Sequence, residues 1–333
     1  MTPSSENGSA ATGRHVQPRS RGQRAADGSG APNRLPAPLA VLVGVVSAVI
    51  GLLPWLISGM RLPLQFIWAT DARPEDMPFA LLPLSGTYLV ATVAMVVVGS
   101  ALAGTAVRIA ARLGRPPRVR LVAVGAAAVQ AVALVQASSV VSGGLEESSR
   151  AQVYLWGMVA GVCVGIIIGL LVMAGIGRAD IASATIAITF AALALTQWLP
   201  FLARPIGSGP LYDADIPAIV WETEKWLPFL IVAVAVGWCG VASLKRAAAS
   251  MVSLASLWIG YAAVIAFNWA VGTRINLQYP SELVSTTSRV FVESLTSFGI
   301  PGRMLVTVVL AAMIAVVLNA VRIVRQTNAS QDD

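Results

Sequence analysis

Carboxylates are the side chains in this sequence whose type and spacing best fit catalytic chemistry. Asp71 and Asp76 share one short polar segment, and Asp213 and Asp215 share another. Two neighbouring carboxylates can serve as general acid and base, and their oxygens are ligands that Mg²⁺, Mn²⁺ and Ca²⁺ prefer. These four aspartates are therefore the candidate catalytic residues. A simpler interpretation stays open, because the loops that face away from the basic side of a membrane protein are acidic without any chemistry.

Several other kinds of catalytic site are excluded. The only histidine is His15, which lies in a polar N-terminal segment, so Ser-His-Asp triads and histidine-based zinc sites have no candidate residues. No Walker A pattern is present to bind ATP. Cys163 and Cys239 lie in apolar stretches, where we expect them to be small buried side chains. We therefore expect no metal site and no cofactor.

The elements that would position any site are eight apolar stretches that contain no charged residue. Each is long enough to cross a hydrocarbon core of roughly 30 Å, and a backbone in lipid must satisfy its own hydrogen bonds, which favours helices. The sequence therefore predicts an all-α, polytopic bundle of about eight membrane spans. The stretches are residues 35–60, 77–107, 121–145, 151–177, 181–203, 226–244, 247–273 and 304–321.

Three regions follow from this pattern. Residues 1–34 are rich in Ser, Gly, Pro and Arg and have few large apolar side chains, which predicts a disordered tail. Residues 35–325 form the predicted membrane domain, and residues 326–333 form a short C-terminal tail. The composition agrees, because 56% apolar and 12% charged residues exclude a soluble core as the main fold.

The distribution of basic residues predicts the orientation. With the N-terminus inside, inner segments carry 15 of the 23 basic residues and outer segments carry 11 of the 16 acidic residues. Both termini are then cytoplasmic. The arginines flank spans and do not alternate with aromatic residues, so we expect no nucleic-acid partner. Only two lysines occur, and abundant Ala, Val and Gly is typical of a GC-rich genome, which favours a bacterial plasma (inner) membrane.

Prolines and a repeated pentapeptide suggest an internal duplication. Trp198-Leu199-Pro200-Phe201-Leu202 recurs unaltered at residues 226–230, and Pro54, Pro83, Pro200 and Pro228 mark the outer ends of spans one, two, five and six. This predicts two parallel four-span halves, about residues 38–178 and 181–325.

A row of glycines predicts close helix packing in span four. Gly157, Gly161, Gly165 and Gly169 recur every four residues and form a groove that another helix backbone can approach. Ser100 and Gly104 in span two form a small pair that can face this groove. Packing within one subunit is the main interpretation, and contact between subunits is the alternative.

Uncharged polar residues are the candidates for a substrate path, because the eight stretches contain no ionisable residue that would couple transport to protons. Gln130, Gln197 and Asn268 lie within spans three, five and seven. Each can line a path for a neutral solute, or each can hydrogen-bond a neighbouring helix. Residues 281–299 carry an interrupted apolar stripe, which predicts either a helix at the outer surface or an irregular loop.

Three functional hypotheses follow. The first, slightly favoured because polytopic chains without soluble domains usually serve transport, is a transporter, flippase or permease-like subunit. The second is an outer-leaflet enzyme that acts on lipid-linked or envelope glycans; Asp71 or Asp76 has a place similar to the acidic residue in the first outer loop of multispan glycosyltransferases. The third is a scaffold subunit of an envelope complex. The expected partners are membrane lipids, a lipid-linked or small neutral substrate, and another membrane protein.

Overall fold

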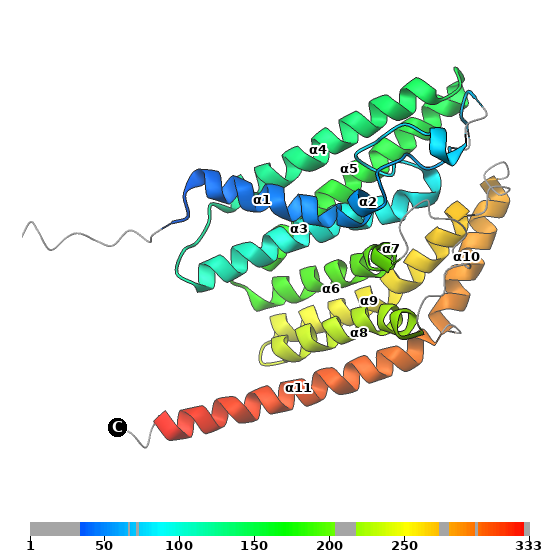
Figure 1. Cartoon of the computed structure of the whole chain (residues 1–333). Helices are drawn as coiled ribbons and strands as arrows, with labels where there is room; N and C mark the ends of the chain where they lie inside the picture. Colours follow the sequence, from blue (N-terminus) through cyan, green and yellow to red (C-terminus); the bar gives the residue numbers. More distant parts are fainter. Residues whose placement is uncertain are drawn as a thin grey trace, which may run out of the picture.

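A computed structural model describes residues 34–65, 67–70, 73–203, 218–272, 280–296 and 299–329 of the 333-residue chain. Within these ranges the chain forms helices and no β-strand, as the sequence predicts (Figure 1). The main helices are α1 (Ala37–Gly51), α2 (Leu53–Ile57), α3 (Leu89–Arg112), α4 (Val119–Gly144), α5 (Ser149–Gly177), α6 (Ile181–Trp198), α7 (Pro200–Ala203), α8 (Ala218–Cys239), α9 (Leu244–Gly272), α10 (Pro280–Thr296) and α11 (Ile300–Ala329).

Six helical segments in the described part of the chain are long and apolar enough to cross a membrane, so the chain is a multi-pass membrane protein. They belong to α3, α4, α5, α6 with α7, α9 and α11. The other two predicted stretches are also helical. However, α1 has only 15 residues, and α8 begins with a charged segment that contains Glu222, Glu224 and Lys225.

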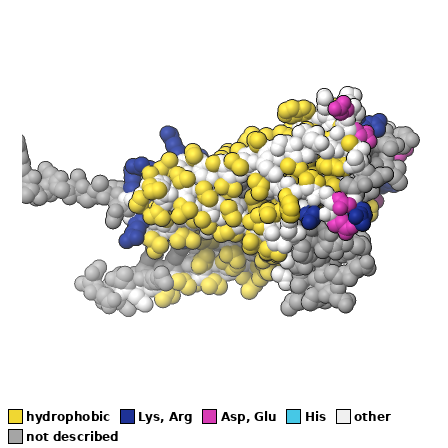
Figure 2. Space-filling view, turned by 45° about the horizontal axis from the view of Figure 1, so that its top comes forward, with side chains coloured by type: hydrophobic (Ala, Val, Ile, Leu, Met, Phe, Trp, Pro, Cys, Tyr) yellow, Lys and Arg dark blue, Asp and Glu magenta, His cyan; other side chains and the backbone are white. Residues whose placement is uncertain are grey.

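The long helices run side by side, and their two ends differ in charge. Figure 2 shows apolar side chains over the middle of one face, basic side chains without acidic ones at one end, and acidic side chains together with some basic ones at the other. We call the end that carries Arg108, Arg178 and Lys245 the basic end. The opposite end, with Glu75 and Glu146 among its residues, is the acidic end. A chain that crosses a membrane with this charge difference has a defined orientation.

The helices pair in the same way in both predicted halves. In the first half α1 packs against α3 and α4, and α3 packs most extensively against α5. In the second half α6 packs against α8 and α9, and α8 packs most extensively against α11. The halves meet where α6 packs against α3 and α5. This common pairing supports the interpretation of two four-helix halves.

Each half begins with a broken helix. In each half a single residue separates the first helix from a short helix that follows it. Helix α1 is followed by α2, which has Pro54 in its first turn, and α6 is followed by α7, which begins at Pro200. The two breaks touch, because α2 contacts α7 and the Trp198 indole N–H donates to the Gly51 carbonyl at 2.7 Å. The Tyr88 and Phe201 rings meet edge to face at 5.9 Å.

The glycine row of α5 lies mostly against α3. A Cβ atom added at Gly161 would lie 3.2 Å from Leu89, one at Gly165 would lie 3.0 Å from Val93, and one at Gly169 would lie 2.7 Å from the Ser100 hydroxyl. These residues allow the α3 and α5 helices to approach closely.

Two further glycines mark the ends of this contact. A Cβ at Gly104 of α3 would lie only 2.6 Å from the Met173 carbonyl of α5. Gly157 differs from the rest of the row, because a Cβ there would meet no described atom within 4 Å. Among the described residues Gly157 therefore lacks the packing contact that the sequence predicts for it.

The segment between α2 and α3 packs over the acidic end of the first half. Leu62, Met77, Leu82 and Leu84 are fully buried, and the buried Trp55 indole donates to the Ala80 carbonyl at 2.8 Å. This first outer segment therefore has an apolar core of its own. Residues 77–88, which the sequence assigns to the second span, belong to this segment, because α3 begins only at Leu89.

Helix α10 confirms the prediction of a helix after span seven, but its position differs from the surface helix that the sequence suggests. It packs against α9, and the Trp258 indole in the middle of α9 donates to the Leu295 carbonyl at 3.2 Å. The chain thus turns back along α9 before α11 begins. At the other end of α11 the helix continues to Ala329, into the predicted C-terminal tail. The N-terminal tail lies outside the described residues.

Candidate functional site

A small polar cavity lies between α6, α8 and α9 near the acidic end, and we call it the α6–α8–α9 cavity. Its volume is about 180 Å³, and it is lined by Thr196, Gln197, Glu224, Lys225, Tyr261, Val264 and Ile265. Five of these seven residues have a polar or charged group. A cavity with charged walls between membrane-level helices is a typical place for a ligand, because ionisable groups are expensive there.

Hydrogen bonds fix the Gln197 side chain in the wall of this cavity. The Asn268 amide N–H donates to the Gln197 Oε1 atom at 2.8 Å, which ties α9 to α6. Gln197 also lies within 3.4 Å of the Thr196 hydroxyl. Two of the three residues predicted to line a substrate path are therefore in contact, although only Gln197 lines the cavity.

The rim of the cavity is charged. Lys225 forms an ion pair with Glu222 at 2.8 Å one helical turn earlier. Lys225 is the main cause that lowers the pKa of the Glu222 carboxyl below its ordinary value, so Glu222 stays ionised. Glu224 and Lys225, which point to the cavity itself, bring one negative and one positive group to it.

Arg303, in the first turn of α11, adds a second positive charge. Its guanidinium lies 6.0 Å from the centre of the Trp226 ring and 5.9 Å from that of Phe229, distances that allow cation–π attraction. Its charge also acts on Tyr261 and Glu222. Phe229 is ten residues before the end of α8 at Cys239, which is about 15 Å along the helix. Arg303 precedes the apolar stretch of its own helix, residues 304–321. Its guanidinium nevertheless lies beside the apolar part of α8.

Gln130, the third residue of the predicted path, lies elsewhere. Its amide Nε2 donates to the Val96 carbonyl at 3.0 Å and to the Ser100 hydroxyl at 3.1 Å, joining α4 to α3. The side chain is almost completely buried. Gln130 thus joins two helices inside the first half, which is the alternative that the sequence left open for it.

The predicted carboxylate site has only one member among the described residues. Asp76 is exposed and forms an ion pair with Arg73 at 3.1 Å. Asp71, Asp213 and Asp215 lie outside the described residues. Within the described ranges no group of three or more His, Cys, Asp or Glu side chains is placed to hold a metal ion.

The sequence does not single out the site residues Tyr261, Glu224, Lys225 and Arg303. One signal was available, because Glu222 and Lys225 have the i,i+3 spacing of a helical ion pair and so indicate that span six begins before Trp226. No comparable signal in the sequence brings Arg303 to this place.

Comparison with known proteins finds no relative of this chain. No family model, no curated protein and no solved structure matches this chain.

Proposed function

We propose that this chain is a transporter-like or flippase-like membrane protein that binds a polar group in the α6–α8–α9 cavity. The observation that carries the proposal is a cavity whose walls bring Gln197, Glu224 and Lys225 together from helices that otherwise pack through apolar side chains. Amide and charged groups are costly to bury between membrane helices, and a polar ligand can add hydrogen bonds to those that they already make.

The size and charge of the cavity indicate the class of ligand. A volume of about 180 Å³ corresponds to roughly six water molecules at about 30 Å³ each. A complete glycan does not fit this volume, whereas a lipid headgroup or a small solute does. Because the walls carry both signs of charge, a zwitterionic group is complementary to them.

Orientation and location are part of the same proposal. The positive-inside distribution supports a cytoplasmic basic end, which places the cavity toward the outer face of a bacterial plasma membrane. The zwitterionic group then enters from the outer side.

A translocation assay tests the proposal. The full chain is reconstituted into vesicles with fluorescent phosphatidylethanolamine, and dithionite quenching measures how fast the probe crosses. In a second arm, vesicles loaded with radiolabelled glycine betaine report the passage of a small zwitterion. We expect one of the two probes to cross faster than in protein-free vesicles, and we expect Gln197→Ala to slow that probe.

The control is Gln152→Ala, the same change at an exposed position of α5. It should leave the rate unchanged. If neither probe crosses faster than in protein-free vesicles, or if both variants slow transport equally, the transport proposal fails. An outer-leaflet enzyme or a scaffold subunit would then be the hypotheses to pursue.

A further inference from the structure

An apolar groove opens on the outside of the bundle between α6 and α8. It has a volume of about 380 Å³ and is lined by Ile188, Leu230, Ile231, Val234, Ala235 and Trp238. Leu230 and Val234 are 43% and 57% exposed, so the groove faces the surroundings of the bundle. Leu230 and Trp238 are eight residues apart on α8, or about 12 Å. This length is close to one leaflet of a hydrocarbon core of roughly 30 Å.

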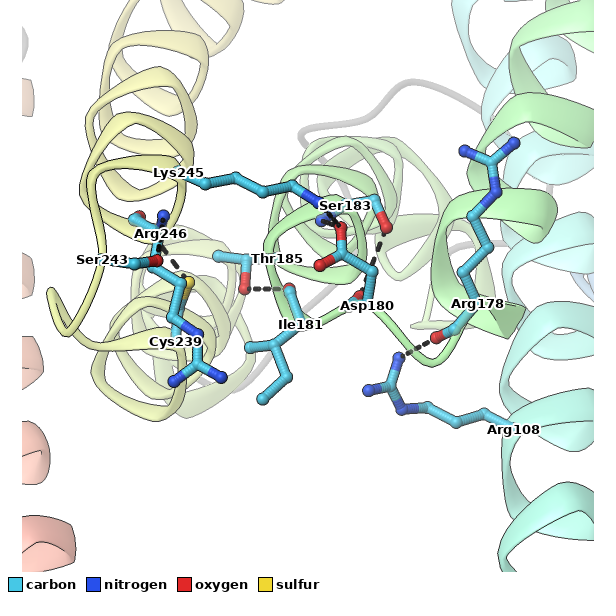
Figure 3. Close-up of polar contacts among 10 residues, drawn as sticks. All are labelled: Arg108, Arg178, Asp180, Ile181, Ser183, Thr185, Cys239, Ser243, Lys245 and Arg246. Carbon is cyan, nitrogen blue, oxygen red and sulfur yellow. Dashed lines mark hydrogen bonds and ion pairs between the residues drawn. The ribbon is translucent and has the colours of Figure 1, made fainter.

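A cation stands at the basic end of the groove. The guanidinium of Arg108 on α3 lies 4.8 Å from the centre of the Trp238 ring. Its Nη1 atom donates to the carbonyls of Ile176 and Arg178 at 2.9 Å each, which fixes the side chain against the end of α5 (Figure 3). A guanidinium has five N–H groups, and Nη1 provides two of them. Within the described residues the other three have no acceptor.

The carboxylate nearby does not neutralise Arg108. Asp180, the only carboxylate at the basic end among the described residues, accepts from Lys245 at 3.0 Å and from the Ser183 backbone N–H at 3.1 Å (Figure 3). Arg112 lies one turn beyond Arg108 on α3 and adds to the positive charge. The mouth of the groove is therefore positive and has unused donors.

We propose that this groove binds an anionic phospholipid, with an acyl chain along Leu230, Val234 and Trp238 and the phosphate on Arg108. The apolar length matches one leaflet, and the donors of Arg108 lie at the end where headgroups begin. Basic pockets between membrane helices at the cytoplasmic side bind anionic headgroups in this way. An apolar partner helix in the groove would offer no acceptor to the Arg108 guanidinium, whereas a phosphate does.

Lipid binding to the full chain tests this site. Purified protein in detergent is titrated with dioleoyl phosphatidylglycerol and dioleoyl phosphatidylcholine, which share acyl chains and differ in charge, and native mass spectrometry counts bound lipids. We expect the wild type to bind phosphatidylglycerol more tightly. Arg108→Gln removes a charged hydrogen bond, which should weaken that binding by roughly tenfold and leave phosphatidylcholine unaffected.

Two more variants keep the test decisive. Val234→Phe fills the groove at an exposed position, so the protein should fold and should bind phosphatidylglycerol more weakly although Arg108 is intact. Arg120→Gln makes the same charge change on α4, which makes no extensive contact with α6 or α8, and should change nothing. Equal losses in Arg108→Gln and Arg120→Gln would mean general surface attraction and overturn the site. Unchanged phosphatidylglycerol binding in Val234→Phe would also overturn the site. Displacement of the lipid by inorganic phosphate would overturn it too, because it would indicate an anion site without a lipid.

Discussion

Replacing Gly104 with alanine tests whether the close contact between α3 and α5 holds the first half together. The added Cβ would lie 2.6 Å from the Met173 carbonyl oxygen and 2.9 Å from its Cα atom, whereas ordinary contacts begin at 3.4 Å. Both atoms belong to the backbone, so no side chain can rotate away and the two helices must separate. Overpacking of this kind costs about 1–3 kcal/mol, and the gain in helix propensity from glycine to alanine returns up to about 1 kcal/mol. We expect a net loss of about 1–2 kcal/mol.

The matched control is Gly157→Ala in α5. A Cβ there meets no described atom within 4 Å, so the helix-propensity gain should remain and stability should be equal to the wild type or up to about 1 kcal/mol higher. Unfolding is followed by tryptophan fluorescence while sodium dodecyl sulfate is added to mixed micelles. Equal stability of the two variants would refute the argument that backbone contact at Gly104 sets the spacing of α3 and α5.

Three further outcomes follow from single contacts. Gln197→Ala removes the acceptor of the hydrogen bond that Asn268 donates and should lower the free energy of unfolding by about 0.6–1.7 kcal/mol in the same titration. Trp198→Phe removes the hydrogen bond between the two broken helices and should cost about 1 kcal/mol; a variant as stable as the wild type would show that this bond does not hold the halves together. Lys245 lowers the pKa of the Asp180 carboxyl, so the pair stabilises the fold above the ordinary aspartate pKa of 3.8 and this contribution is lost as the pH falls through the lowered value. Asp180→Asn should flatten the pH dependence of the melting temperature below about pH 4, and an unchanged pH profile would contradict the pairing.

The sequence predicts the helices well because the physical demand on them is simple. A stretch such as 151–177 has no charge and must satisfy its own backbone hydrogen bonds, and the structure has α5 at Ser149–Gly177. Helix ends are harder, because a helix can extend past the apolar stretch into charged residues. This extension puts Glu222 and Lys225 on α8, and Arg303 in the first turn of α11.

The choice of partner helix is not contained in the periodicity of one span. The row from Gly161 to Gly169 predicts that some backbone comes close, but it does not say that the partner is α3. The true correspondence between the halves is similarly hidden. The breaks align Leu52-Leu53-Pro54-Trp55-Leu56 with residues 198–202. Trp55 then matches Phe201, but Trp198 matches a leucine. The exact repeat at residues 226–230 is easier to see, but in the structure it belongs to a different helix of the same half.

The α6–α8–α9 cavity lies in the second half, where the order of helices differs from that in the first. In the first half a short turn joins α4 to α5, and the two helices pack together. In the second half α10 stands between α9 and α11 in the order of elements and packs against α9. It ends near Trp258, in the middle of α9. Helix α11 therefore starts level with Phe229, where Ile300 is fully buried, and has little contact with α9. This late start brings Arg303 close to Trp226 and Tyr261. The insertion of α10 into an otherwise shared helix order thus supplies the charge that distinguishes the second half from the first.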